Sequence, residues 1–441
     1  MSEHFDILVV GAGPAGIAAA VSASAAGKRV GLVDDNPAAG GQIWRTRASQ
    51  PAAARKWLAK LDAAPVFRLQ GWRVFDHPRR GMLRAECDGV CRELCYGQII
   101  LATGARELFL PFPGWTLPNV MGAGGLDAMV RGGLRILGKR VVVAGTGPLL
   151  LAVAAHLARR GAKIVALCEQ APMRRVVPFS VHLLSEPAKL LQGIGYLIAT
   201  HATRFYTSCW PIAASGREKL ESVTLQRNER NWEVHCDYLA CGYHLVPNLE
   251  LAALLGCRID DGFVCADHLQ RTSVADVFCV GEPTGIGGVD LALLEGQIAG
   301  LAAAGRTADA ERLARRRRQR LGFVHALRDA SALNPRLRNL ATEETLVCRC
   351  EDVSFGALRE YRSWREAKLQ TRCGMGPCQG RICGAATEFL FGWDSALVES
   401  GIRPPVFPVR VSSLGIHDKR AFPSDSFTPS SEFTDFSKET Q

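Results

Sequence analysis

The stretch Phe5-Asp6-Ile7-Leu8-Val9-Val10-Gly11-Ala12-Gly13-Pro14-Ala15-Gly16 decides the fold. Its apolar beginning is typical of a buried strand, and the alanine-rich segment from Ile17 to Ala26 predicts a helix. A second strand, Arg29–Val33, ends at Asp34. In such a unit the glycines permit a tight turn and close approach of a pyrophosphate, the helix N-terminus faces the phosphates, and the acid accepts from a ribose hydroxyl. The alternative is a merely structural glycine turn. The expected adenine-nucleotide contacts are Gly11, Gly13, Pro14, Ala15, Gly16 and Asp34.

Three further segments are expected to lie beside this unit. Gly40–Arg45 resembles the segment by which flavoproteins of the thioredoxin-reductase-like group contact FAD, with a surface turn as the alternative. Gln98–Ala105 resembles the return strand beside the FAD of the same proteins. Val277–Glu282 lies where they place a Gly-Asp pair that holds the ribityl chain, but here the acid is Glu282, one methylene longer, which leaves a full flavin in question. The expected contacts are Gly41, Gln42, Thr103, Gly104, Gly281 and Glu282.

The chain repeats the nucleotide-binding pattern once, in a degraded form. A strand over Lys139–Ala144, the loop Gly145–Leu150 and a helix over Leu151–Arg160 follow the order of the first copy. Leu150 replaces the third glycine. Its larger side chain is expected to hold the helix away from the strand. Cys168 stands where the first copy has its acid, and Glu169 comes one place late. The sequence of this second copy therefore favours a domain that serves packing and partner contact over a domain that binds NAD(P).

Late in the chain, four of its 15 cysteines form two tight pairs, Cys348-Arg349-Cys350 and Cys373-Gly374-Met375-Gly376-Pro377-Cys378. Thiolates grouped this closely repel one another unless a cation or a cluster neutralises them, and the glycines leave backbone N–H groups free to face sulfur. Zinc knuckles usually separate paired cysteines by two to four residues, so a Cys-x-Cys pair fits zinc less well. A [2Fe–2S] cluster on Cys348, Cys350, Cys373 and Cys378 is favoured over zinc, a disulfide or ordinary buried cysteines. Cys383 is a spare thiol that can displace one of these four.

The segments Thr345–Val353 and Arg372–Arg381 carry a family resemblance. Together they are similar to the bacterioferritin-associated-ferredoxin-like domain at the end of the larger, HcnB-like subunits of opine oxidases, D-hydroxyproline dehydrogenases and hydrogen cyanide synthase. The resemblance extends over residues 5–415. It implies the electron-transfer (α) subunit of a heteromeric flavin-dependent amine or amino-acid dehydrogenase, with D-hydroxyproline, an opine or a similar secondary amine as substrate, or with glycine in a hydrogen cyanide synthase.

The same resemblance implies partners and cofactors. A glycine-oxidase-like FAD β subunit would oxidise the substrate, a small ferredoxin-like γ subunit is a further expected partner, and a respiratory acceptor would take the electrons. In related proline dehydrogenase complexes the corresponding subunit is thought to hold ATP in the first cleft, with FMN at the subunit interface. The resemblance therefore leaves FAD and ATP open for that cleft, and implies a [2Fe–2S] cluster at the cysteines.

Bulk composition narrows the function classes further. The formal net charge of +10 is concentrated in an arginine run from Arg312 to Arg320 that lacks interleaved aromatic residues. Such a run favours a solvated helix face or an interface over nucleic-acid binding, with anionic lipid as an alternative. The N-terminus is a poor signal peptide, no apolar stretch is long enough to span a membrane, and the 15 cysteines favour a reducing compartment. A cytoplasmic location is expected, extended to peripheral contact with the inner face of the cell membrane.

The sequence thus predicts an α/β fold with two Rossmann-like domains of the glutathione/thioredoxin reductase type and a small C-terminal helical [2Fe–2S] domain. The flavin-binding regions contain no redox Cys-x-x-Cys pair, which argues against a disulfide reductase, and no general base can be assigned. The rival functions are a stand-alone NAD(P)H-dependent FAD oxidoreductase, an iron–sulfur sensing module and a zinc-stabilised adaptor. The expected limits are 1–115 with 245–305 for the first domain, 116–244 for the second, 306–342 for an arginine-rich linker, 343–415 for the cluster domain and 416–441 for a disordered tail.

Overall fold

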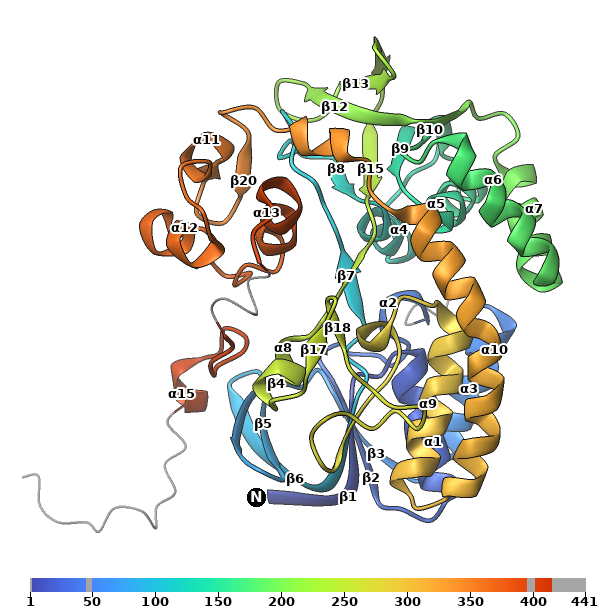
Figure 1. The fold of residues 1–441 in the computed structure, drawn as a ribbon, viewed down its shortest axis with the longest axis vertical. Helices are drawn as coiled ribbons and strands as arrows, with labels where there is room; N and C mark the ends of the chain where they lie inside the picture. Colours follow the sequence, from blue (N-terminus) through green and yellow to red (C-terminus); the bar gives the residue numbers. More distant parts are fainter. Residues whose placement is uncertain (1, 45–49, 395–400, 415–441) are drawn as a thin grey trace, which may run out of the picture.

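The computed structural model describes residues 2–44, 50–394 and 401–414, so the tail predicted at 416–441 lies outside them. Figure 1 shows two large α/β units one above the other, with a smaller, mostly helical unit beside the upper one. Two sheets with parallel central strands form the cores of the large units, which confirms the α/β class predicted from the sequence.

The lower unit is built on a seven-stranded sheet. Its order is β3-β2-β1-β6-β5-β4, with β19 paired to β6. The pairs among β3, β2, β1, β6 and β19 are parallel, whereas β4, β5 and β6 form an antiparallel meander. The bounds are β1 (Ser2–Val10), β2 (Val30–Asp34), β3 (Val66–Gln70), β4 (Arg73–Arg79), β5 (Met82–Cys87), β6 (Val90–Leu101) and β19 (Val277–Cys279).

Helices α1 (Pro14–Ala25) and α9 (Val289–Ala303) pack on this sheet with very close backbones. A Cβ atom at Gly296 would lie 2.1 Å from the carbonyl oxygen of Ala15, and one at Gly300 would lie 2.4 Å from that of Ala19. Because only glycine fits there, the late segment around α9 is held against the first glycine loop. The remaining helices here are α2 (Gly41–Trp44), α3 (Ala52–Ala63) and α8 (Glu250–Leu254), with the short turn η3 (Glu282–Thr284) before α9.

The upper unit repeats the parallel arrangement. Its sheet has the order β11-β10-β9-β15-β8, and all four pairings are parallel. A separate antiparallel sheet, β12-β13-β14, lies at the top of Figure 1. The bounds are β8 (Val120–Gly122), α4 (Ala123–Arg131), β9 (Arg140–Gly145), α5 (Pro148–Arg159), β10 (Lys163–Glu169), α6 (Met173–His182), α7 (Pro187–Ala199), β11 (Phe205–Thr207), β12 (Cys209–Ser215), β13 (Ser222–Arg227), β14 (Arg230–His235) and β15 (Tyr238–Gly242).

Two crossing strands and one long helix connect these units. The crossing strands β7 (Ala105–Glu107) and β16 (Leu245–Pro247) pair antiparallel. The arginine-rich helix α10 (Thr307–Ser331) packs along α9 and reaches α6, where the rings of Phe323 and Phe179 are in contact. The turn η4 (Pro335–Asn339) then places Leu337 and Leu340 in the core of the upper unit and leads into the helical unit.

The helical unit contains the paired cysteines. It consists of the hairpin β20 (Leu346–Cys348) and β21 (Val353–Ser354) and of helices α11 (Phe355–Leu358), α12 (Trp364–Thr371) and α13 (Cys383–Phe391). Its small core includes Trp364, Leu358 and Trp393 together with buried cysteines. A one-turn helix, α15 (Val411–Leu414), lies further along the chain.

Candidate functional site

The first glycine loop contains glycines of two kinds. Gly11 has φ +104°, and a Cβ there would lie 2.2 Å from the carbonyl oxygen of Ala102. A Cβ at Gly16 would lie 1.7 Å from the carbonyl oxygen of Gly11. At Gly13 the nearest atom to an added Cβ is the Cα of Gly41, 4.0 Å away. The chain itself therefore requires Gly11 and Gly16, whereas the space above Gly13 is left free, as close approach of a ligand requires.

The structure brings most of the predicted nucleotide contacts to this loop. A Cβ at Gly41 would lie 2.8 Å from the Cα of Gly13, so the second predicted segment lies against the first. Pro14 begins α1, and Ala15 lies 3.1 Å from an added Cβ at Gly281. Gln42, in α2, is exposed beside Gly41.

The acid at the end of β2 is more constrained than the sequence suggests. Asp34 Oδ2 accepts from the backbone N–H of Ala12 at 2.5 Å, and Oδ1 accepts from the N–H of Asn36 at 2.7 Å. Asp34 is buried and organises the loop, and its Oδ2 atom, which accepts one hydrogen bond among the described residues, keeps a second lone pair for the predicted ribose hydroxyl. The next residue, Asp35, is exposed, and its closest cation is Arg73, with Nε 3.6 Å from Oδ2. Sequence spacing alone gives no reason to assign the ribose contact to Asp35 rather than to Asp34.

Thr103–Gly104 and Gly281–Glu282 adjoin the same glycine loop, and we refer to the region that they share with Gly13 as the nucleotide cleft. Thr103 Oγ1 donates to the carbonyl oxygen of Asn248 at 2.7 Å, so this hydroxyl already has a partner within the chain. The N–H of Gly281 donates to Glu295 Oε2 at 2.9 Å. Glu282 Oε2 is buried and has no hydrogen-bond partner among the described residues. An orphaned buried carboxyl oxygen at the position predicted to face the nucleotide fits a ligand hydroxyl.

Glu282 also predicts a pH effect on stability. Burial, together with the nearby Glu295 carboxylate, raises the pKa of Glu282 from 4.5 to about 7. Because the folded state holds this proton more tightly than the unfolded state, the stabilisation is complete below pH 4.5 and is lost as the pH rises through 7. We expect nucleotide-free wild-type protein to lose up to about 3 kcal/mol relative to Glu282→Gln between pH 5 and 8. Urea denaturation at both pH values measures the difference; parallel curves would contradict it, and the exposed Glu218→Gln variant is the control.

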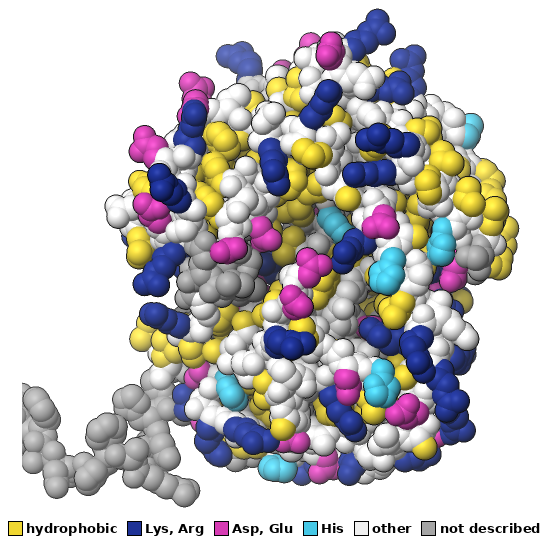
Figure 2. Space-filling model, viewed as in Figure 1, with side chains coloured by type: hydrophobic (Ala, Val, Ile, Leu, Met, Phe, Trp, Pro, Cys, Tyr) yellow, Lys and Arg dark blue, Asp and Glu magenta, His cyan; other side chains and the backbone are white. Residues whose placement is uncertain are grey.

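A cavity of about 180 Å³ lies beside this cleft, between η3, α9 and α10. Its lining includes His244, Thr284, Glu295 and Arg317, and Figure 2 shows the molecule hollowed at the level between the two large units. Arg317 Nε lies 2.7 Å from Glu295 Oε1, so one arginine of the α10 run is turned inward to a buried carboxylate. Burial lowers the pKa of His244 and favours the neutral imidazole.

The second glycine loop is closed by the chain itself. Glu169 Oε2 accepts from the N–H of Gly147 at 2.7 Å, and Oε1 accepts from Thr146 Oγ1 at 2.9 Å. Gly147 is the counterpart of Gly13, so a carboxylate takes the amide that would face a phosphate. A Cβ at Gly147 would also lie 3.1 Å from Ser331 Oγ, at the end of α10.

Hydrogen bonds from the residues after α10 hold the covering segment in place over the second glycine loop. Gln170 Nε2 donates to Thr146 Oγ1 at 3.0 Å and to the carbonyl oxygen of Ala332 at 3.2 Å, and Gln170 Oε1 accepts from the N–H of Asn334 at 2.9 Å. Arg175 Nη1 donates to the same carbonyl at 2.9 Å. The sequence indicates a weakened second site; the covering segment is a further obstacle that no local motif could reveal.

The cysteine site gathers five thiols rather than four. The sulfur atoms of Cys348, Cys373 and Cys383 lie within 4.8 Å of one another. The Cys383 thiol also interacts with that of Cys378, which in turn interacts with that of Cys350. All four predicted ligands are therefore in one group, and Cys383 lies between its two halves.

Backbone N–H groups face three of these sulfurs. Gly374 N donates to Cys348 Sγ at 3.4 Å, and the N–H of Glu351 faces the same sulfur. Cys378 receives the N–H groups of Ile382 and Gly380, and Cys350 receives that of Cys378. Contact with the Cys373 and Cys383 thiols, with these N–H donors, lowers the pKa of Cys348 to about 2, and contact with Cys383 lowers the pKa of Cys378 to about 5. A thiol-rich, N–H-lined group of this kind fits a metal–sulfur centre.

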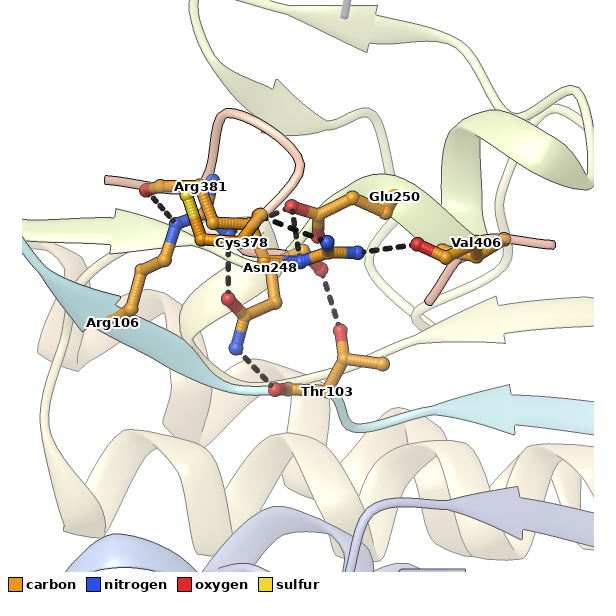
Figure 3. A network of polar contacts seen from close by, with 7 residues as sticks. All are labelled: Thr103, Arg106, Asn248, Glu250, Cys378, Arg381 and Val406. Carbon is orange, nitrogen blue, oxygen red and sulfur yellow. Dashed lines mark hydrogen bonds and ion pairs between the residues drawn. The ribbon is translucent and has the colours of Figure 1, made fainter. Parts of the chain in front are cut away.

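A network of polar contacts joins this site to the nucleotide cleft (Figure 3). Arg381, in the loop between Cys378 and Cys383, lies 3.4 Å from Glu250 Oε1 through its Nε atom. Arg106 Nη1 lies 2.9 Å from the same carboxylate oxygen, and Asn248 Nδ2 donates to the carbonyl oxygen of Thr103 at 2.8 Å.

Comparison with known proteins agrees with this architecture. Residues 5–306 match the family described as pyridine nucleotide-disulphide oxidoreductase. The A subunit of opine oxidase from Agrobacterium tumefaciens is 32% identical, over 94% of this chain and 92% of the relative. The HcnB subunit of hydrogen cyanide synthase from Pseudomonas aeruginosa is 32% identical, over 85% of this chain and 90% of the relative.

Among solved structures, L-proline dehydrogenase from P. horikoshii is similar, with a TM-score of 0.67 and 18% identity over 94% of this chain and 80% of that chain. This likeness concerns the fold and covers most of the chain. The predicted pair of reductase-type domains is confirmed, and the described residues add a small C-terminal helical unit that contains the paired cysteines.

Proposed function

The chain belongs to the pyridine nucleotide-disulphide oxidoreductase family and, within it, to the group that includes HcnB and the A subunit of opine oxidase, and from this premise we propose that it is the electron-transfer subunit of a heteromeric flavin-dependent amine or amino-acid dehydrogenase. That the chain is an oxidoreductase follows from the family. The observation that carries the proposal is the pairing of an open first nucleotide loop with a five-thiol site, while the second nucleotide loop is closed.

FAD is the cofactor that the family implies for the first cleft. The free space at Gly13, the adjoining Gly41 and the orphaned Glu282 oxygen fit a dinucleotide with a hydroxylated chain. Bound there, FAD would supply two-electron acceptance. ATP in this cleft, with FMN at a subunit interface, is the second assignment. Chromatography of the nucleotide released by denaturing the purified chain distinguishes FAD from ATP.

For the thiol site we propose a [2Fe–2S] cluster, which would supply one-electron steps. The ligands predicted from the sequence are Cys348, Cys350, Cys373 and Cys378. Three of these, all but Cys373, have sulfurs that face backbone N–H groups. The fourth ligand has to lie with the other three around one two-iron unit. Cys383 interacts with both Cys348 and Cys378, whereas Cys373 adjoins Cys348 and Cys383. We therefore propose Cys383 as the fourth ligand in place of Cys373.

Substrate oxidation is proposed to occur on a partner. The relatives are subunits of enzymes by name, and the described residues of this chain offer no assigned general base. We propose a glycine-oxidase-like FAD β subunit as the partner that oxidises the substrate, which is D-hydroxyproline, an opine or a similar secondary amine. A small ferredoxin-like γ subunit is a further proposed partner, and a respiratory acceptor would take the electrons. Co-purification with the products of neighbouring genes, followed by a substrate screen, tests this proposal. Turnover of an amine by this chain alone would contradict it.

Glycine oxidation, within a hydrogen cyanide synthase, is the second candidate function because the similarity to HcnB matches that to the opine oxidase relative. Including glycine in the substrate screen, with cyanide detection, decides between them. No helix among the described residues is long and apolar enough to span a bilayer. We propose a cytoplasmic location with peripheral contact at the inner face of the membrane, which fractionation of cell extracts would test.

NADH and NADPH are not expected to reduce the bound flavin. The Glu169 carboxylate occupies the Gly147 amide, and the Ser331–Asn334 segment covers the loop, so a nicotinamide dinucleotide has neither a phosphate site nor space. The measurement is flavin absorbance under anaerobic conditions after NADH addition, with dithionite as the positive control. Rapid bleaching by NADH would instead support a stand-alone NAD(P)H-dependent oxidoreductase.

A further inference from the structure

The contact between the cysteine site and the nucleotide cleft is built on one shared carboxylate. Glu250, at the start of α8, is buried, and its Oε1 atom faces both Arg106 and Arg381. The side chains of Arg106, Glu250 and Arg381 are 21%, 8% and 15% exposed. Arg106 and Arg381 carry two positive charges, and Glu250 carries one negative charge, so one positive charge is uncompensated within this trio. Because the three side chains are little exposed, solvent screens this charge only weakly.

Arg381 also fixes the loop that carries two of the proposed ligands. Its Nη1 atom donates to the carbonyl oxygen of Cys378 at 3.3 Å, and its Nη2 atom donates to that of Val406 at 2.9 Å. The backbone carbonyl of Arg381 in turn accepts from Arg106 Nε at 2.9 Å. The guanidinium stacks on the Phe407 ring, 4.0 Å from its centroid. The loop is thus held through both the side chain and the backbone of Arg381.

The same network ends at the nucleotide cleft. Arg106 Nη1 donates to Asn248 Oδ1 at 2.8 Å, and Asn248 Nδ2 donates to the carbonyl oxygen of Thr103 at 2.8 Å. The N–H of Asn248 donates to the carbonyl oxygen of Gly104 at 2.9 Å. Figure 3 shows these side chains converging from the crossing strands, α8 and the cysteine loop. A continuous set of direct contacts therefore runs from Cys378 to the Thr103–Gly104 segment that follows β6.

We propose that Arg381 is a positioning residue that holds the Cys378–Cys383 loop against the nucleotide-binding domain and that its partly buried cation raises the reduction potential of the centre held by that loop. Nearby net charge and hydrogen bonding are the means by which a protein sets the potential of an iron–sulfur centre. A guanidinium beside the ligand loop favours the reduced, more negative form. The inference rests on the proposed function, because it assumes a cluster on these cysteines.

The effect of the Arg381 charge on the reduction potential is tested in the purified full-length chain. The measurement is a redox titration of the cluster, monitored by electron paramagnetic resonance. Arg381→Gln is expected to shift the midpoint potential to a more negative value, and Arg381→Lys, which keeps the charge, to restore most of it. Glu250→Gln removes the anion and is expected to shift the potential the opposite way. The control is Arg359→Gln, on the same unit, whose side chain is 58% exposed and paired with Glu343. An unchanged potential in Arg381→Gln would overturn this effect of the charge.

The positioning role of Arg381 can be tested without the cluster. Hydrogen exchange followed by mass spectrometry, on chains prepared without iron, is expected to show severalfold faster exchange in the peptides spanning residues 376–383 and 103–106 of Arg381→Gln, with little change in Arg359→Gln. Equal exchange in wild type and Arg381→Gln would overturn the positioning role. If wild-type chains bind no iron at all, the proposed function fails while the exchange result still decides the positioning role.

Discussion

Replacing Cys383 with serine is expected to abolish the visible absorption of the iron–sulfur centre, whereas replacing Cys373 leaves it in place. The sulfur of Cys383 interacts with those of Cys348, Cys373 and Cys378, so it adjoins both halves of the thiol group. Cys373 hydrogen-bonds with Cys348 and Cys383 but interacts with Cys378 only electrostatically, so without Cys383 no described thiol hydrogen-bonds with both Cys348 and Cys378. Loss of one ligand from such a centre is expected to remove the metal altogether.

The measurements are iron content and the absorption spectrum of chains purified without oxygen. Cys373→Ser is the matched comparison, because Cys373 is equally buried in the same small core. Cys279→Ser, in β19 of the first sheet, controls for loss of a buried thiol elsewhere. A spectrum that survives in Cys383→Ser and vanishes in Cys373→Ser would restore the ligand set predicted from the sequence. Zinc in place of iron in the wild-type chain would remove the redox role.

The first nucleotide unit is predictable because its determinants are local. The order of strand, glycine loop, helix and strand is fixed within β1, α1 and β2, and the glycine spacing matches the close backbone approaches at Gly11 and Gly16. The hairpin of β5 and β6 likewise follows from alternating residues around Asp88–Gly89, and the register pairs Cys87 with Val90.

The features that the sequence does not reveal depend on contacts between distant segments. Glu169 comes one place late in the sequence pattern, yet its longer side chain reaches the Gly147 amide and closes the loop. Ser331 covers the same loop from a helix that follows much later in the chain, and no motif signals such a contact. The tight spacing of the pairs at Cys348 and Cys373 favours their members as ligands over Cys383, but the start of α13 brings Cys383 back to them.

The glycine positions of the first loop separate ligand binding from folding, and Gly13→Val is expected to abolish retention of the nucleotide without unfolding the chain. Gly13 has φ −73° and ψ −177°, an extended conformation that valine adopts readily. An added Cβ meets no chain atom closer than 4.0 Å, so the new side chain extends into the space kept for phosphate beside Gly41. Nucleotide content is expected to fall at least tenfold, which corresponds to about 1.4 kcal/mol or more of lost binding free energy.

The measurement is the nucleotide released per chain after gel filtration, together with the melting temperature of nucleotide-free protein. Gly193→Val, at a partly exposed position of α7 where an added Cβ also meets nothing within 4 Å, controls for the substitution itself. Gly16→Val is the opposite case, since its Cβ would lie 1.7 Å from the Gly11 carbonyl oxygen, and it is expected to destabilise the fold. Unchanged nucleotide content in Gly13→Val would show that the ligand does not approach this loop, because nothing in the chain itself offsets the added bulk.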